Sequence, residues 1–505
     1  MQKKWLMLPL LLWLVAWMSA AEAAPKIESW TTQNGLRVYY VHAPELPMVD
    51  LRLVFDAGSA RDGAKMGLAM LTNGMLDKGA AGLSEDQLAE QFESIGAILS
   101  SGTSSDMGWI GLRTLTMAQE QKAALGTWLK VLSKPDFPQK DFERVQKLTL
   151  VGLQEEKQNP EALANKAFDK AVYGEHPYGQ PENGTEETIP ALTVNDLKAF
   201  YQQYYVAKNG LLAIVGAVDR AQAQSLAEQV ANVLPTGEAA APIPEVKPLT
   251  EAKTIKISYP SAQSHILVGQ VGNKRGDPDY FTLYMGNQVL GGSGFTSRLM
   301  KEVRTDRGLS YSVYSYFAPL AQLGVFEVGL QTKKEQTEQA LQVVRDVIGK
   351  FQKEGPTDTE LEACKKDITG GFPLRTASNG QIVEYVGVIG FYKLPLDYLD
   401  TFTSKISVLT RAQIADAFAR RLQPDKMVTV IVGGDQTAAP AAPASPPPQP
   451  PQPVTPPPSV PPVPPAAPPV PVPNTDKPNT VTTTPSQPNV APTNPQTNQP
   501  ATSGQ

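Results

Sequence analysis

The chain has 505 residues, more than a single domain of ordinary size contains. Hydrophobic residues make up 41 % of it, enough for sizeable cores, and the formal net charge is −5 at pH 7. Since no basic stripe stands out, the sequence argues against a nucleic-acid partner.

The first 23 residues have the pattern of a secretory signal. Lys3 and Lys4 precede the apolar run "WLMLPLLLWLVAW", and Ala21-Glu22-Ala23 forms an A-x-A cleavage site. The run is short for a membrane span, which needs about 20 apolar residues. We therefore predict a signal peptide over residues 1–23 and export to the periplasm. An uncleaved anchor is the alternative.

Strands are predicted to open each of two halves. Residues 36–58 contain two β-rich runs around a proline-bearing turn, and residues 255–272 fill the same place later in the chain. Helices follow, for example over residues 85–99 and over residues 336–355, where Gly355 ends the pattern.

An internal repeat closes each half. The segments "LTVNDLKAFYQQYYVAKNGLLAIVGAVD", from Leu192, and "LTRAQIADAFARRLQPDKMVTVIVGGD", from Leu409, share one pattern. Each has a Leu-Thr helix start, an amphipathic helix and a buried strand that ends in Val-Gly. Strands first, helices next and a last strand predict an α+β half that is present twice. Chance similarity of two helix–strand units is the alternative.

The composition divides the remainder of the chain. We expect the halves at residues 26–235 and 251–436, joined by a Pro- and Ala-rich linker at residues 236–250. Residues 437–505 form a tail with more than half of the chain's 46 prolines, a composition typical of polyproline II or disorder. The tail is interpreted as a spacer or docking arm in the cell envelope, or as an inert extension.

The second half contains a segment with candidate binding residues, "LGGSGFTSRLMKEVRTDRGLSYSVYSYF", residues 290–317. Its pattern predicts a flexible glycine turn, a helix over residues 297–307 that Gly308 ends, and a strand over residues 309–317. Arg304 and Tyr311 stand seven residues apart, and the glycine turn would let both reach one cleft. A guanidinium and a phenol donate hydrogen bonds to a peptide carbonyl or to its oxyanion. A surface arginine and a packed tyrosine are the alternative.

The segment "GLAMLTNGMLDKGA", from Gly67, together with the preceding "AGS", resembles the start of an insulinase/pitrilysin-type peptidase half. In active members "GLA" is followed by His-x-x-Glu-His, an inverzincin motif in which two histidines bind Zn²⁺ and the glutamate is the general base. Those positions correspond here to Met70, Asn73 and Gly74, none of which can perform these roles.

The family's third zinc ligand is also replaced under this resemblance. It is a glutamate some 75 to 80 residues further on, and the corresponding position is Val151 or Gly152. A slip of one helical turn in the alignment would move it to Glu155 or Glu156.

Other metal-binding or nucleophilic residues are few. His42, His176 and His265 are the only histidines, and no two have metal-ligand spacing. The single cysteine, Cys364, lies in a helical pattern, so no internal disulfide framework is expected. We expect all four to be structural.

The resemblance covers about residues 26–435, and it includes "HPYG" and "GG-x-x-S-R-L". Active members carry an Arg and a Tyr seven apart that reach the bound substrate, so the resemblance implies that Arg304 and Tyr311 bind substrate. It also implies two sheets packed with helices in a clam-shell.

Some enzymes of this family are heterodimers in which one subunit lacks zinc and supplies the Arg/Tyr pair. This chain resembles that subunit, which implies no metal on this chain and zinc on a partner subunit. A pseudo-peptidase that binds peptides or scaffolds envelope proteins is the alternative. A stand-alone hydrolase with another centre is the weakest hypothesis, because no Ser/His/Asp group is readable.

Overall fold

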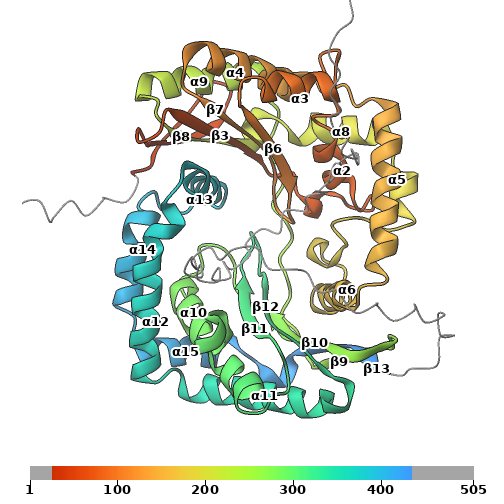
Figure 1. Ribbon diagram of the computed structural model, residues 1–505, viewed down its shortest axis with the longest axis vertical. Coiled ribbons are helices and arrows are strands. Elements are labelled where there is room, and N and C mark those ends of the chain that lie inside the picture. Colours follow the sequence, from red (N-terminus) through yellow and green to blue (C-terminus); the bar gives the residue numbers. More distant parts are fainter. Residues whose placement is uncertain (1–25, 435–505) are drawn as a thin grey trace, which may run out of the picture.

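The computed structural model describes residues 26–434. The predicted signal peptide and proline-rich tail lie outside the described residues. Two sheets, of six and five strands, organise the described chain, and helices pack against both (Figure 1). The fold is therefore α+β, as predicted. No helix among residues 26–434 is long and apolar enough to cross a membrane.

The first sheet has the strand order β1-β2-β8-β3-β7-β6. Its strands are β1 (Glu28–Thr31), β2 (Arg37–His42), β3 (Met48–Phe55), β6 (Ile98–Thr103), β7 (Gly108–Leu115) and β8 (Gly210–Gly216). Only the pairing of β2 with β8 is parallel. Every residue of β8 is buried, because this strand lies in the middle of the sheet.

The second sheet repeats this topology in the order β11-β12-β10-β13-β9. Its strands are β9 (Lys253–Ile257), β10 (Ser261–Val271), β11 (Val313–Ala318), β12 (Val325–Lys333) and β13 (Val428–Gly434). Here β9 and β13 form the parallel pair. The closing strands β8 and β13 thus occupy equivalent places, which confirms the internal repeat.

The helices that precede these closing strands also agree with the sequence pattern. Helix α8 (Val194–Tyr204) and helix α15 (Arg411–Arg421) each begin with a capping box, at Thr193 and Thr410. In both boxes the threonine hydroxyl accepts a hydrogen bond from the backbone N–H three residues on, which satisfies a free donor of the first turn.

The remaining helices belong mainly to one sheet each. The core of the first sheet contains residues from α2 (Leu68–Gly74), α3 (Glu85–Glu93), α4 (Ala118–Ser133), α5 (Gln139–Glu156), α7 (Thr188–Ala191) and α9 (Arg220–Val233). The core of the second contains residues from α10 (Tyr280–Asn287), α11 (Thr337–Glu354), α12 (Asp358–Gly371) and α14 (Tyr398–Ser407). A short hairpin, β4 (Gly79–Ala80) and β5 (Leu83–Ser84), precedes α3.

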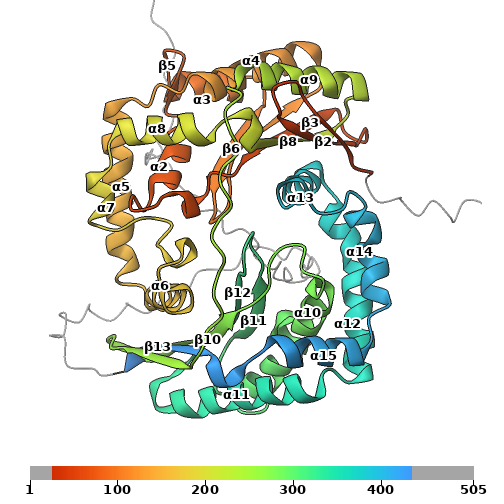
Figure 2. The same ribbon diagram turned by 180° about the vertical axis from the view of Figure 1, so that it is seen from behind.

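Two helices cross from one sheet to the other. Helix α6 (Pro160–Tyr173) packs against β10 and β13 of the second sheet, and α13 (Asn379–Phe391) packs against β2, β3 and β8 of the first. Both lie between the two sheets in opposite views (Figures 1 and 2). A Cβ on Gly390 would lie 2.7 Å from the ring of Tyr39, so α13 approaches the first sheet closely. Each sheet is therefore covered in part by a helix that comes from the other half of the chain.

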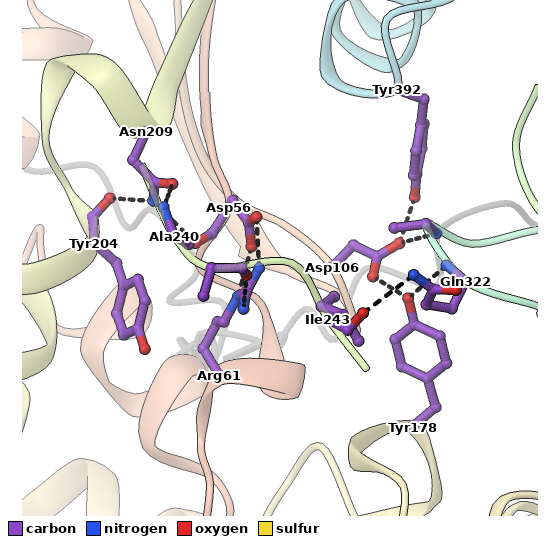
Figure 3. Close-up of polar contacts among 12 residues, drawn as sticks. Asp56, Arg61, Asp106, Tyr178, Tyr204, Asn209, Ala240, Ile243, Gln322 and Tyr392 are labelled. Atoms are coloured by element: carbon purple, nitrogen blue, oxygen red, sulfur yellow. Dashed lines mark hydrogen bonds and ion pairs between the residues drawn. The ribbon is translucent and has the colours of Figure 1, made fainter. Parts of the chain in front are cut away.

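A buried carboxylate joins the two parts of the chain (Figure 3). Asp106 accepts hydrogen bonds from the hydroxyls of Tyr178 (2.6 Å) and Tyr392 (2.8 Å) and from the backbone N–H of Ala321 (2.8 Å). Burial raises the pKa of Asp106. The hydrogen bonds from Ala321 and Tyr392 connect segments that are more than 200 residues apart in the sequence, so they fix the relative position of the sheets.

The segment expected to be a linker, residues 236–250, has no regular secondary structure, but two carbonyls in its middle accept hydrogen bonds from other parts of the chain (Figure 3). The Arg61 guanidinium donates to the Ala241 carbonyl (2.7 Å), and the Gln322 amide donates to the Ile243 carbonyl (3.1 Å). Ile243 is buried. The segment is thus packed into the molecule.

One predicted helix is shorter than expected. The pattern over residues 85–99 predicted a single helix, but α3 ends at Glu93 and Ile98 begins β6. Gly96 has a φ of 65°, a left-handed conformation that ends the helix and turns the chain into the strand.

Candidate functional site

Helix α2 carries the positions of the degenerate zinc motif. It begins after Gly67, whose φ of 90° favours glycine. The Asp62 carboxylate accepts hydrogen bonds from the N–H groups of Gly67 (2.8 Å) and Ala69 (2.7 Å). Burial raises the pKa of Asp62 to about 7, although these hydrogen bonds act in the opposite direction. Asp62 therefore stabilises the N-terminus of α2, and the sequence pattern did not single out this residue.

The side chain of Asn73 belongs to the core. It is 2 % exposed, and its amide donates hydrogen bonds of 3.1 Å to the Trp109 carbonyl oxygen and to the Tyr205 hydroxyl oxygen. Met70 packs against the same core. Gly74 offers no side chain, and a Cβ there would meet nothing within 4 Å. A thioether, an engaged amide and a glycine do not form a donor set for Zn²⁺.

The positions of the distal ligand also provide no metal site. Val151 is 51 % exposed on α5, beside Gly152. Of the two glutamates one turn further on, Glu155 is exposed, whereas Glu156 pairs with Lys166 and accepts a hydrogen bond from Asn183 (2.9 Å). Among residues 26–434, no three His, Cys, Asp or Glu side chains gather as a metal-binding group.

The three histidines lie in different structural settings. A ring nitrogen of His42 lies 2.9 Å from the Val218 carbonyl oxygen, and one of His176 lies 2.9 Å from the Pro244 carbonyl oxygen. His265 stands in β10, where burial lowers its pKa.

Cys364 is buried, and burial raises its thiol pKa to about 12, so little nucleophilic thiolate forms near neutral pH.

Arg304 and Tyr311 lie next to each other. The guanidinium carbon of Arg304 is 5.7 Å from the centroid of the Tyr311 ring, within cation–π distance. Tyr311 is 87 % exposed. The sequence pattern placed it in a strand from residue 309, but β11 begins at Val313. The Ser310 hydroxyl bonds to both the N–H and the C=O of Ser312, which bends the chain before the strand.

The helix predicted over residues 297–307 is present, but the part of it that contains Arg304 is not α-helical. It belongs to a π-helix, η6 (Met300–Thr305), and a second π-helix, η4 (Gln288–Gly292), precedes the glycine turn. π-Helical turns are rare in proteins, but those that occur often lie at functional sites. Between them, the 3-10 turn η5 (Gly294–Thr296) places the Phe295 ring 4.6 Å from the Arg304 guanidinium carbon. The sequence analysis did not single out Phe295. The feature that could have indicated it is an aromatic residue within a glycine-rich turn.

Comparison with known proteins identifies the family. Residues 37–186 match the description "Insulinase (Peptidase family M16)", and residues 191–368 match "Peptidase M16 inactive domain". A crystal structure titled peptidase M16 inactive domain, from Pseudomonas fluorescens, is 41 % identical with a TM-score of 0.79, covering 82 % of this chain and 100 % of that one. The chain therefore belongs to the insulinase family of M16 peptidases and their homologues.

More distant relatives carry contrasting names. The "Non-peptidase homolog YmxG" of Helicobacter pylori is 26 % identical over 79 % of this chain and 92 % of its own length. The "Uncharacterized zinc protease YmxG" of Bacillus subtilis is 24 % identical over 70 % of this chain and 85 % of its own length. The periplasmic protease PqqL of Escherichia coli shares the fold, with a TM-score of 0.70 and 17 % identity over 82 % of this chain and 46 % of that one.

Proposed function

We propose that this chain is the zinc-less subunit of a heterodimeric periplasmic metallopeptidase. A zinc-bearing member of the same family would be its partner and would hold the metal and the general base. This chain would bind the peptide substrate and stabilise the transition state through Arg304 and Tyr311. No catalytic residue of its own is assigned to it.

One combination of features carries this proposal. The two histidine positions of the zinc motif are occupied by Met70 and Gly74, and the position of the general base is occupied by Asn73, whose amide is engaged in the core. Meanwhile Arg304 and Tyr311 lie together, with the tyrosine ring exposed. An enzyme that had only lost its zinc motif would have no use for the Arg304/Tyr311 pair. A subunit that acts beside a zinc-bearing partner would still use this pair to bind substrate.

The chemistry of the pair suits this role. When water attacks a peptide carbonyl, its oxygen becomes an oxyanion, and a guanidinium and a phenol aimed at that oxygen stabilise the charge. The N–H donors of an arginine are also suited to holding a peptide backbone carbonyl. Periplasmic location is supported by the predicted signal peptide and by the description of the distant neighbour PqqL as a periplasmic protease.

The test is a pull-down of the full chain from periplasmic extract, followed by zinc analysis and a peptidase assay of the complex. We expect a co-purifying relative with His-x-x-Glu-His, zinc in the complex and peptidase activity only in the complex. Cleavage by the purified chain alone, with contaminants excluded, would overturn the proposal.

The second candidate function is a pseudo-peptidase that binds peptides or scaffolds envelope proteins. The name "non-peptidase homolog" of the Helicobacter pylori relative favours it. The same pull-down separates the two functions, because a chain that binds peptides without any zinc-bearing partner would support the scaffold.

A further inference from the structure

The Asp106 carboxylate stands where three other segments of the chain meet the loop between β6 and β7 (Figure 3). It is 1 % exposed. One of its oxygens accepts a hydrogen bond from Tyr178, in the 3-10 turn η2 (Pro177–Gly179), and the other accepts from Tyr392 and from the Ala321 N–H. Tyr178 and Ala321 pack in a core that contains residues of β10, β12 and β13. Asp106 is therefore a link from the first sheet to the core of the second.

No cation pairs with this carboxylate in the part of the chain that the structure describes. The recorded partners of Asp106 are two phenols and a backbone N–H, all uncharged. The Arg61 guanidinium is held by both oxygens of Asp56, at 2.7 Å and 2.6 Å. Arg275 lies over the ring of Tyr392, with its guanidinium carbon 5.3 Å from the centroid. Binding a proton would neutralise Asp106 without rearranging these charged side chains.

Other carboxylates surround Asp106. Glu182, in the loop after η2, accepts a hydrogen bond of 2.6 Å from the hydroxyl of Ser105, the residue before Asp106. Burial raises the pKa of Asp106, and the negative charge of Asp56 acts in the same direction. Burial also raises the pKa of Glu182, and here the charge of Asp106 adds to the effect. Glu182 in turn adds to the effect of burial on the pKa of Asp62. The cluster therefore resists full ionisation.

We propose that Asp106 and Glu182 form a proton-sensitive junction, which holds the second-sheet core to the first sheet more firmly at acid pH than at alkaline pH. In the closed junction the two carboxylates are shielded from water, and they repel each other when both are ionised. Separation of the loop that carries Ala321 would admit water, which stabilises the ionised forms. The phenols of Tyr173 and Tyr178 stay neutral, because burial raises the pKa of both, so the carboxylates are the groups that titrate.

The direction of the effect follows from the closed and the open junction. In the closed junction the pKa of both carboxylates lies above its ordinary value, and in the open junction water returns it toward that value. The closed junction therefore binds more protons. Its stabilisation is present at acid pH and is lost as the pH rises through the raised pKa values of the closed state. The pH around the chain thus sets how firmly its two halves are held, whether or not a partner subunit is bound.

The test measures amide hydrogen exchange of the full chain at pH 5 and pH 8 with single-residue resolution, after correction for the intrinsic effect of pH. The Ala321 N–H donates to Asp106 (2.8 Å), so its protection reports whether the junction is closed. The Gly324 N–H, in the same loop, donates to the Asn273 carbonyl (3.0 Å) and is the internal control. From pH 5 to pH 8 we expect protection to fall about tenfold at Ala321 and less than about twofold at Gly324.

Variants assign the effect to individual carboxylates. Asp106→Asn keeps the shape of the side chain but cannot ionise, so it should abolish the pH response of Ala321. Glu182→Gln keeps an acceptor for Ser105 and removes the neighbouring charge, so it should reduce the fall to about threefold or less. Glu175→Gln removes an exposed charge seven residues earlier and should leave the response unchanged. Circular dichroism and the unfolding midpoint establish that each variant is folded, and the Glu182 variant tests the junction if Asp106→Asn fails to fold.

Four results would overturn the inference. They are unchanged protection of Ala321 between the two pH values, a fall in Asp106→Asn equal to that of the wild type, a fall in Glu182→Gln equal to that of the wild type, or an equal fall at Gly324. The last result would mean that the whole loop unfolds at alkaline pH. No partner subunit takes part in these measurements, so their outcome is independent of the heterodimer proposal.

Discussion

The Asn73 amide donates a 3.1 Å hydrogen bond to the Tyr205 hydroxyl, deep in the core of the first sheet. Asn73 occupies the position where active relatives are expected to have the general base. An equivalent use of asparagine occurs in the second half, where the Asn287 amide on α10 donates to the Ser315 carbonyl (2.9 Å). In both halves an asparagine ties a helix to its own sheet. The replacement of the general base is therefore also a structural contact.

The first prediction concerns this contact. Asn73→Ala should lower the free energy of unfolding by about 1–3 kcal/mol, because it leaves the Trp109 carbonyl and the Tyr205 hydroxyl without their buried partner. Urea unfolding followed by circular dichroism measures this. Gly74→Ala is the matched control. It adds a methyl group into open space and should be neutral or stabilise by up to about 1 kcal/mol. Equal effects of the two substitutions would contradict the structural role of Asn73.

The second prediction concerns restoring the motif. The triple variant Met70→His, Asn73→Glu, Gly74→His should bind no stoichiometric zinc and show no zinc-dependent peptidase activity. Position 73 faces the core, and the expected distal position is Val151 or Gly152. Metal analysis after dialysis and a peptidase assay measure the outcome. Robust zinc-dependent activity would mean that the distal ligand lies elsewhere, for example at Glu155 or Glu156.

The third prediction concerns transition-state stabilisation in the proposed heterodimer. Tyr311→Phe should reduce the turnover of the reconstituted complex about 10²- to 10³-fold, the loss typical when one oxyanion donor is removed. The exposed ring contacts little of the core, so the stability of the chain should not change. Steady-state kinetics of the complex measure the effect, and Tyr259→Phe, at an exposed hydroxyl that bonds the Gln158 carbonyl, is the control. Full turnover of the Tyr311 variant would remove the assigned role.

The fourth prediction concerns the helix that crosses to the first sheet. Gly390→Ala should destabilise the chain by about 1–3 kcal/mol, because its Cβ would lie 2.7 Å from the ring of Tyr39 and would push α13 off the sheet. Gly370→Ala, in α12, is the control, since a Cβ there meets nothing within 4 Å. Unfolding midpoints in urea compare the two. A Gly390 variant as stable as the control would show that α13 can move without cost.

The fifth prediction is a pH dependence. Burial raises the pKa of Asp62 to about 7 in the folded chain, above an unfolded value of about 4. Between these values the folded state binds more protons, so the contribution of Asp62 to stability is present at acid pH and is lost as the pH rises through about 7. From pH 5 to pH 8 the wild type should lose about 2 kcal/mol more than Asp62→Asn, which cannot titrate. Urea unfolding at both pH values measures this, and identical pH dependence of the two chains would contradict it.

Much of the fold was predictable because local patterns decide it. The two Leu-Thr helix starts, the strands at residues 36–58 and 255–272, and the helix end at Gly355 were all read from periodicity and capping residues, and the structure confirms them. Periodicity failed where backbone geometry departs from the regular types. It did not indicate the left-handed Gly96 that ends α3 early, or the π-helical turns around Phe295.

The sequence by itself determined that the three positions of the zinc motif hold Met70, Asn73 and Gly74, whose side chains cannot bind the metal or act as its general base. It also determined the repeated α+β pattern, which depends on contacts between near neighbours. Only the tertiary structure decided that α6 packs on the second sheet and α13 on the first, and that Asp106 joins segments more than 200 residues apart. It also decided that the Phe295 and Tyr311 rings both lie beside the Arg304 guanidinium group. These contacts join residues across loops and turns, and their geometry depends on how whole elements pack.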